Sequence, residues 1–290
     1  MNIMVNIRVA LRALKSNMLR SFLTVLGIVI GVAAVVALLG VGRGATASIT
    51  DRVAGMGSNL ISISAQMRFG PGGASSSASI LFDDYERMQE NVEGIASITP
   101  VFTSQLTVNS STRTANYSVS GVTPDYLDVR SYEIAEGRFI SEEDYLANKQ
   151  VAVLGSTVAE DIFEGLSPIG RKLKIKGVEF TVIGIFAESG SSGGMSSGDE
   201  VIGVQLSAGY TKLFGSSAMS NGRQTLSTIY ISAENAEVVD QVINDCELVL
   251  RSEHALTLTE DLPFSVSSQA QALEALSAVS STMTIFLGAI

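Results

Sequence analysis

Residues 22–42, FLTVLGIVIGVAAVVALLGVG, decide the architecture, because these 21 consecutive positions contain no charged side chain. An α-helix rises about 1.5 Å per residue, so about 20 apolar residues are needed to cross a hydrocarbon core of about 30 Å. The apolar core of a signal peptide is shorter, about 7–15 residues. The length of the run therefore predicts a transmembrane helix, with bounds 21–43, rather than a cleaved leader.

Residues 1–20 precede this helix and carry basic side chains but no acidic ones. Apolar residues line one face of the segment at helical spacing and basic residues the other: Ile3, Ile7, Leu11, Leu14 and Met18 against Arg8, Arg12 and Lys15. This pattern predicts an amphipathic helix at the membrane surface, in contact with lipid. By the positive-inside rule the N-terminus is cytoplasmic, and the chain from about Arg43 onward, Lys149 included, is extracytoplasmic. The small residues Ala45–Thr46–Ala47 leave cleavage by a signal peptidase as an alternative.

Gly27 and Gly31 form a GxxxG pattern within the run, and Ala34 follows on the same side. Small residues at this spacing allow a second membrane helix to approach closely. We therefore expect Gly27, Gly31 and Ala34 to form a helix-packing surface, although the same pattern also arises by chance in apolar sequences.

The charge balance excludes one class of partner. All 29 acidic residues and all but four of the 19 basic residues lie in 43–290, which gives this segment a net charge of −14. Nucleic-acid binding requires clustered lysine and arginine, so we expect no nucleic-acid partner.

No catalytic, metal or cofactor site is predicted. The segment GLSPIGRK, 165–172, imitates a phosphate loop, but Lys172 stands where a Ser or Thr would bind magnesium. The single histidine, His254, has no second histidine with which to share a metal, and a solvated or helix-capping role is expected. The single cysteine, Cys246, lies on the apolar face of a predicted helix over 235–251 and is expected to be buried and inert.

The region after the first helix alternates short strands with helices, which predicts an α+β domain. Residues 59–111 and 226–267 each contain a strand–helix–strand pattern and are assigned to one lobe. Residues 112–225, richer in strands and turns, are assigned to an inserted β-rich lobe. The individual predictions are strands at 60–64, 95–102, 105–109, 114–121, 151–154 and 228–233, helices at 83–91 and 156–163, a hairpin over 172–186 turning at Lys176–Gly177, a weak capping box at Ser141 and Asp144, and flexible loops at 70–79 and 187–198.

The end of the chain is apolar again. Residues 275–290 are uncharged, but 16 residues of helix span only about 24 Å, less than a hydrocarbon core. We expect 268–290 to be a stalk and the start of a second transmembrane helix in a longer protein.

Two segments resemble one known family. ALRALKSNMLRSFLTVLGIVIGVAAVVALLGVGRG, residues 10–44, resembles the start of a MacB-type ABC transporter permease of the FtsX superfamily. Residues 121–186 contain the GRF, VAVLGS, PIG and FTVIGI elements of that family's external domain. The resemblance covers essentially the whole chain and is carried by the ordered set, since each element alone is weak.

The resemblance implies a permease in the cell membrane, with a porter-like strand–helix lobe and an inserted β-rich lobe outside. It implies that ATP hydrolysis by a separate ATPase chain is transmitted mechanically, through the membrane helices, to move cargo such as drugs, peptides or lipoproteins. The implied partners are that ABC ATPase, a second copy or a paralogous permease, and, in some members, a periplasmic adaptor and an outer-membrane duct. On this interpretation 44–58, with Ala47, and 268–290, with Ala272, are stalks.

Three departures accompany the resemblance. Most of the later membrane helices are missing, no ATPase is fused at the N-terminus, and residues 201–215 lack a proline that the family often has. The competing interpretation is a membrane-anchored binding or sensing module without transport, and a secreted soluble protein comes third.

Overall fold

The computed structural model describes residues 18–54, 59–66, 78–110, 113–188 and 198–271, together with 274, 278, 279 and 282; for 38, 39, 41, 43 and 45–54 only the backbone is considered. The chain divides into two units, one of residues 1–51 with 273–290 and one of residues 52–272. Each unit is described by itself.

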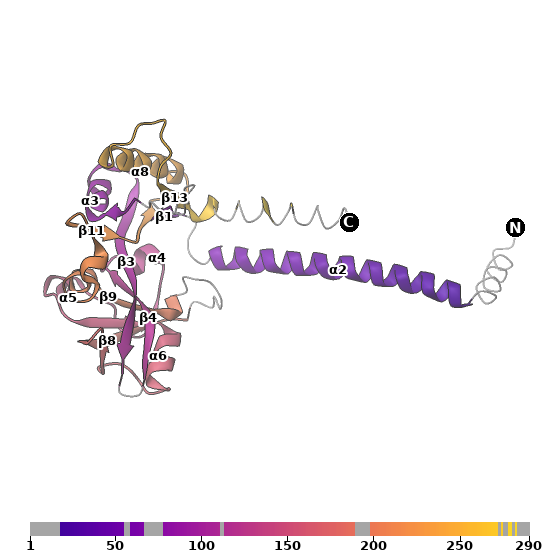
Figure 1. Cartoon of the computed structure of the whole chain (residues 1–290), viewed down its shortest axis with the longest axis horizontal. Helices are drawn as coiled ribbons and strands as arrows, with labels where there is room; N and C mark the ends of the chain where they lie inside the picture. The colour runs from indigo at the N-terminus through magenta and orange to yellow at the C-terminus, as the bar shows by residue number, and fades with distance from the viewer. Residues whose placement is uncertain are drawn as a thin grey trace. The chain divides into compact units, whose positions relative to one another are not determined.

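The first unit is dominated by the helix α2, Met18–Ala54, which is continuous over 37 residues (Figure 1). It contains no proline, and its described residues end at Ala54, directly before Gly55 in the sequence. Within it, Met18–Ala37 is long and apolar enough to cross a membrane, and it is the one such helix in the described part of the chain. Thr24, the single polar side chain between Phe22 and Ala37, donates its hydroxyl to the Arg20 carbonyl at 2.7 Å, so it is satisfied inside the helix.

The amphipathic helix expected over 1–20 lies almost wholly outside the described residues, and Met18–Arg20 form the first turn of α2. At the other end of the chain, Gln269–Gln271 are helical, as are the described residues 274, 278, 279 and 282. The predicted flexible loops at 70–79 and 187–198 fall mostly outside the described residues.

The second unit is a mixed α/β domain built on one sheet path, in the order β13-β1-β12-β3-β4-β9-β6-β8-β5, with β7 pairing with β3 and β8. The strands are β1 Leu60–Ala65, β3 Ile95–Asn109, β4 Thr114–Val122, β5 Ile134–Gly137, β6 Val151–Leu154, β7 Lys172–Ile175, β8 Val178–Phe186, β9 Val201–Gln205, β12 Thr228–Ala233 and β13 Phe264–Ser268. A small separate sheet has the order β10-β11-β2, with β10 Met219–Ser220, β11 Arg223–Leu226 and β2 Ile80–Leu81.

The helices of this unit are α3 Phe82–Asn91, α4 Tyr126–Arg130, α5 Glu142–Leu146, α6 Ser156–Phe163, α7 Leu206–Ala208 and α8 Val239–Glu253. Short irregular helices at Gly198–Glu200, Gly209–Phe214 and Gly215–Ala218 flank β9 and β10.

One end of the sheet is formed by β13, β1, β12 and the first half of β3, all antiparallel. One face of these strands packs with α3 and α8 around a buried apolar core. That core includes Ile61, Ile63, Ile98, Ile229, Ile231, Val242, Cys246 and Phe264. The alternation of Ile with Ser along β1 sends every second side chain to this core, which is why the sequence predicted the strand correctly.

The strand β3 corrects one prediction. Two strands were expected at 95–102 and 105–109, but the chain forms one strand of 15 residues. It pairs with β12 up to Val101 and with β4 from Phe102 onward. The polar residues that suggested a break are accommodated, since Thr103 Oγ1 and Ser120 Oγ on β4 share a hydrogen bond of 2.8 Å.

The structure also tests what the sequence predicted for the single cysteine and the single histidine. Cys246 is fully buried, as expected, and burial raises the pKa of its thiol to about 12. The side chain of His254 is 16% exposed, with Nε2 3.0 Å from Asp84 Oδ2 and the ring 4.6 Å from that of Phe264. Its backbone occupies the C-cap position of α8, one of the two roles expected from the sequence.

The far end of the sheet depends on a close backbone approach between β5 and β8. The hairpin β7–β8 turns at Lys176–Gly177, both with positive φ, as predicted. Where β5 pairs with β8, a Cβ on Gly184 would collide with the backbone carbonyl of Arg138, and one on Gly137 would collide with that of Ile183. Gly137 also has a φ of +81°. Both glycines are therefore required by the pairing.

We predict that Gly184→Ala lowers the free energy of unfolding by at least about 2 kcal/mol, because the clash is with backbone and cannot be relieved by a rotamer change. Chemical denaturation of the chain in detergent measures this. Gly203→Ala on β9 is the matched control, since its Cβ would meet only ordinary contacts at 3.6 Å or more, and it should change stability by less than about 1 kcal/mol. Equal stability of the two variants would show that the β5–β8 contact is looser than described.

Candidate functional site

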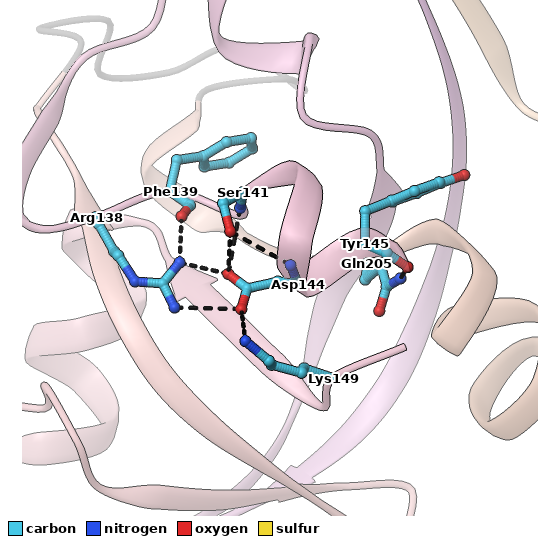
Figure 2. Close-up of polar contacts among 7 residues, drawn as sticks. All are labelled: Arg138, Phe139, Ser141, Asp144, Tyr145, Lys149 and Gln205. Carbon is cyan, nitrogen blue, oxygen red and sulfur yellow. Dashed lines mark hydrogen bonds and ion pairs between the residues drawn. The ribbon is translucent and has the colours of Figure 1, made fainter. Parts of the chain in front are cut away.

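A buried carboxylate organises the region where the sequence motifs converge. The side chain of Asp144, on α5, is only 1% exposed. Both of its oxygens accept hydrogen bonds (Figure 2): Oδ2 from Arg138 Nη1, from Ser141 Oγ at 3.0 Å and from Ser141 N at 3.2 Å, and Oδ1 from Lys149 Nζ at 2.8 Å and Arg138 Nη2 at 3.3 Å. The carboxylate and its three partner side chains are called the Asp144 clamp below.

The clamp fixes a short stretch of chain between two strands. Arg138 directly follows β5, Ser141 is the N-cap of α5, and Lys149 lies two residues before β6. Ser141 and Asp144 form a reciprocal capping box, which the sequence had suggested only weakly. One buried side chain therefore sets the path of the chain from β5 through α5 to β6.

The electrostatics of the clamp favour the ionised carboxylate. The hydrogen bonds from Arg138, with help from Lys149 and Ser141, outweigh burial and hold the pKa of Asp144 far below its usual range. The same carboxylate raises the pKa of Arg138. Because the guanidinium and the ammonium are about half exposed, only the carboxylate is fully removed from water.

The neighbouring side chains extend this arrangement to the strands. Phe139 stacks near Tyr126 and lies 5.9 Å from the ring of Phe186 on β8. The fully buried Gln205, at the end of β9, donates Nε2 to the Tyr145 carbonyl on α5 (Figure 2) and to Ser207 Oγ at 3.0 Å. The helix α5 is thus held from β5, β6 and β9 at once.

The motif elements quoted from the sequence meet in this region. GRF supplies Gly137, Arg138 and Phe139, VAVLGS forms β6 and the start of α6, and FTVIGI forms β8. PIG makes the turn into β7, with Gly170 N donating to the Val182 carbonyl at 2.8 Å. The segment that imitates a phosphate loop is this turn.

The clamp fixes the conformation of the chain and leaves no free carboxylate oxygen for chemistry. The Asp144 carboxylate is saturated with donors, so it is not available as a base or nucleophile. In the parts of the chain that the structure describes, no cluster of three or more His, Cys, Asp or Glu side chains could hold a metal.

The residues predicted for membrane packing lie on α2. Gly27 and Gly31 are one helical turn apart, both exposed, and a Cβ on either would meet nothing within 4 Å. Ala34 is exposed as well. Ala47 lies within the backbone of α2, and Ala272 lies outside the described residues. The packing and stalk roles therefore stay predictions.

Sequence reasoning missed most of the clamp. The spacing predicted the capping box of Ser141 and Asp144, but no feature of the sequence identified Arg138 and Lys149 as partners of Asp144. The signal that could have revealed them was the position of Arg138 inside the GRF element, next to a glycine that the fold requires.

The fold is thus a mixed α/β domain that accompanies a helix long enough to cross a membrane. The chain belongs to the family of MacB-like periplasmic core domains, whose model matches residues 21–247. It is 30% identical to the macrolide export ATP-binding/permease protein MacB of Azoarcus sp. strain BH72, over 98% of this chain and 41% of that protein. It is 32% identical to the protein of the same name from Bdellovibrio bacteriovorus, over 96% and 42%. The chain therefore spans about two fifths of the length of these relatives.

Two solved structures share the fold at low sequence identity. The periplasmic region of MacB from Actinobacillus actinomycetemcomitans superposes with a TM-score of 0.61 at 19% identity, covering 79% of this chain and 98% of that one. The extracellular domain of the noncanonical ABC-type transporter YknZ from Gram-positive bacteria superposes with a TM-score of 0.57 at 17% identity, covering 72% and 100%.

We predict that Asp144→Asn lowers the free energy of unfolding by about 1–3 kcal/mol near neutral pH, because the cationic partners lose their counter-charge and an amide cannot accept the same set of donors. Denaturation of the full chain measures this. Glu179→Gln is the control, since Glu179 pairs with Lys172 at an exposed site and should matter by less than about 0.5 kcal/mol.

The wild-type chain and the Asp144→Asn variant can also be compared as a function of pH. The pKa of Asp144 is lowered by folding, so its stabilising contribution is present above the carboxyl's unfolded value of about 4 and is lost as the pH falls toward the folded value. The stability difference between wild type and Asp144→Asn should therefore shrink between about pH 6 and pH 2. A difference that stays constant over this range would contradict the ionised clamp.

Proposed function

We propose that the chain is part of the permease of a MacB-type ABC transporter, in which a separate ATPase chain hydrolyses ATP in the cytoplasm and the external domain moves cargo outside the membrane. The observation that carries this proposal is family membership combined with one unbroken apolar helix in the same chain. The cargo class suggested by the names of the relatives is a macrolide, and peptides or lipoproteins are the other classes that we consider.

The proposed topology has a cytoplasmic N-terminus, α2 in the membrane, and residues from about Arg43 outside. It is supported by the basic residues before the span and by the exposure of the apolar side chains of α2. Lipid would cover these side chains, and a second permease copy or a paralogous permease would pack at Gly27, Gly31 and Ala34.

The length of α2 supports mechanical coupling. Its 37 residues extend about 55 Å, while the hydrocarbon core takes about 30 Å, so about 25 Å of helix remains beyond the hydrocarbon core. A continuous helix can transmit displacement, whereas a break would absorb it. We propose that residues 44–58 and 268–290 act as stalks. The displacement that they transmit would move the external domain as two lobes, one formed by 59–111 with 226–267 and the other by the inserted segment 112–225.

The remaining partners follow from the same proposal. The ATPase would contact cytoplasmic parts of the full permease, and a periplasmic adaptor and an outer-membrane duct would receive the cargo in a diderm cell. The alternative of an anchored sensing module predicts the same topology but no ATP-dependent movement of cargo, so the two differ in function and not in orientation.

We predict that a cysteine at Asn6 is protected from a membrane-impermeant maleimide in intact cells, whereas a cysteine at Leu258 is labelled. Leu258 is 79% exposed, and it replaces Lys149 as the external position because Lys149 belongs to the Asp144 clamp. The native Cys246 can stay, since it is fully buried, and the unmodified chain is the control. Labelling at Asn6 in intact cells, or a mature N-terminus at Ser48, would overturn the topology.

We predict that Ala47→Pro in the full-length permease, paired with its ATPase, keeps ATP turnover but loses cargo export. Proline removes a helical hydrogen bond and clashes with the preceding turn, at a local cost of about 3 kcal/mol. Ala47→Leu preserves the helix and is the matched control; Ala272→Pro tests the second stalk. Normal export by both proline variants, with kinks confirmed structurally, would refute transmission through rigid stalks.

A further inference from the structure

In the main sheet, the two proposed lobes of the external domain are joined along a single strand. β3 pairs with β12 of one lobe up to Val101 and with β4 of the other lobe from Phe102 onward. A strand shared in this way keeps the two lobes connected, but it can twist about its own axis. The angle between the lobes therefore depends on side-chain contacts that cross the junction beside β3.

The short helix α4 lies at this junction. Figure 1 shows it along β3, between the part of the domain that carries α8 and the part that carries α6, and it packs on both β3 and β12. Its last residue, Arg130, belongs to the inserted segment 112–225 and is only 8% exposed. Among the residues that the structure describes, no other basic residue is buried to this degree.

Arg130 is buried without a carboxylate partner in the described parts of the chain. Its Nη2 donates to the hydroxyl of Tyr132 at 2.7 Å, and its Nε is buried with no hydrogen-bond partner. The central carbon of the guanidinium lies 5.1 Å from the ring centroid of Tyr132 and 4.3 Å from that of Tyr230. Because a buried charge is costly unless it is compensated, the faces of these two tyrosines are what stabilises the cation.

The two tyrosines belong to different lobes. Tyr132 follows α4, and its ring lies 5.7 Å from that of Phe186 on β8, which fixes it within the inserted segment. Tyr230 lies on β12, between β1 and β3, and therefore belongs to the other lobe. Arg130 is thus hydrogen-bonded within its own lobe and stacked on a ring of the other.

We propose that Arg130 is a positioning residue that sets the angle between the two lobes through its contact with Tyr230. A hydrogen-bonded ion pair has a fixed geometry, whereas a cation over an aromatic face has no fixed hydrogen-bond direction. The contact therefore restrains the lobes and still allows the displacement that mechanical coupling needs. Beside it, the hydroxyls of Thr99 and Thr123 share a hydrogen bond of 2.8 Å across the same junction. This inference rests on the two lobes of the proposed function and is independent of the cargo.

The distance between the lobes tests the proposal. Nitroxide labels on cysteines at Leu258 and Leu166, which are exposed and lie in different lobes, report this distance by double electron–electron resonance on the full chain in detergent. Labelled chain is diluted with unlabelled chain, so only distances within one molecule contribute, and Cys246 can stay because it is fully buried. Arg130→Met should raise the fraction of molecules outside the wild-type distance range about tenfold, as loss of one desolvated cation–π contact does.

Substitutions at Tyr230 separate the aromatic face from simple packing. Tyr230→Phe keeps the ring that faces the guanidinium and should keep the wild-type distances. Tyr230→Leu should reproduce the effect of Arg130→Met, and combining the two should add little to either alone. Arg113→Met is the matched control, because Arg113 pairs with Asp161 inside the inserted segment and should leave the distances unchanged.

Unchanged distances in Arg130→Met and Tyr230→Leu, both shown by denaturation to be folded, overturn the proposal. The same holds if Tyr230→Phe behaves like Tyr230→Leu, because the aromatic face would then not be the contact that matters. If Arg130→Met does not fold, the comparison of the two Tyr230 variants decides. Export is not measured here, so a negative result leaves the transport function to its own test with Ala47→Pro.

Discussion

The rest of the domain depends on one strand that serves two sets of partners. β3 runs for 15 residues, and its hydrogen-bonding partner changes from β12 to β4 between Val101 and Phe102. A strand can change partner in this way only if its backbone stays extended through the transition, because a bend would break both ladders. The segment 112–225 is thereby attached to the outer strands through continuous main-chain pairing, and a displacement of one end of β3 must be felt by the other.

At the far end of the sheet, the Asp144 clamp compensates for the side-chain packing that is missing where the glycines bring β5 and β8 close together. Strands this close leave no room for a Cβ at Gly137 or Gly184, so the chain gains proximity but loses side-chain packing. The clamp then holds the chain that leaves β5 with hydrogen bonds and charge instead of apolar contact. A buried carboxylate is costly unless every lone pair is used, and here donors surround both oxygens. Because both oxygens of the Asp144 carboxylate are fully hydrogen-bonded, the clamp serves to fix the path of the chain between β5 and β6.

Under the proposed mechanical coupling, the external domain needs stiff parts that transmit displacement. The described residues fit this requirement, because their apolar residues form three buried cores packed on one sheet path. The long helix α2 meets the same requirement by having no proline and by satisfying Thr24 internally.

The sequence by itself determined the features that depend on neighbours along the chain. A charge-free run fixed α2, strict alternation fixed β1, helical spacing placed Cys246 in the core, and Lys176–Gly177 gave the hairpin turn, because each follows from local geometry and the need to bury apolar surface. Tertiary structure alone decided the rest. The continuity of β3 through Thr103 and Ser104 depended on a partner strand, and the hydrogen bond that holds His254 depended on Asp84, 170 residues away. Arg138 and Lys149 were not identified as partners of Asp144 for the same reason, because the role of a charged side chain depends on the groups that folding brings next to it.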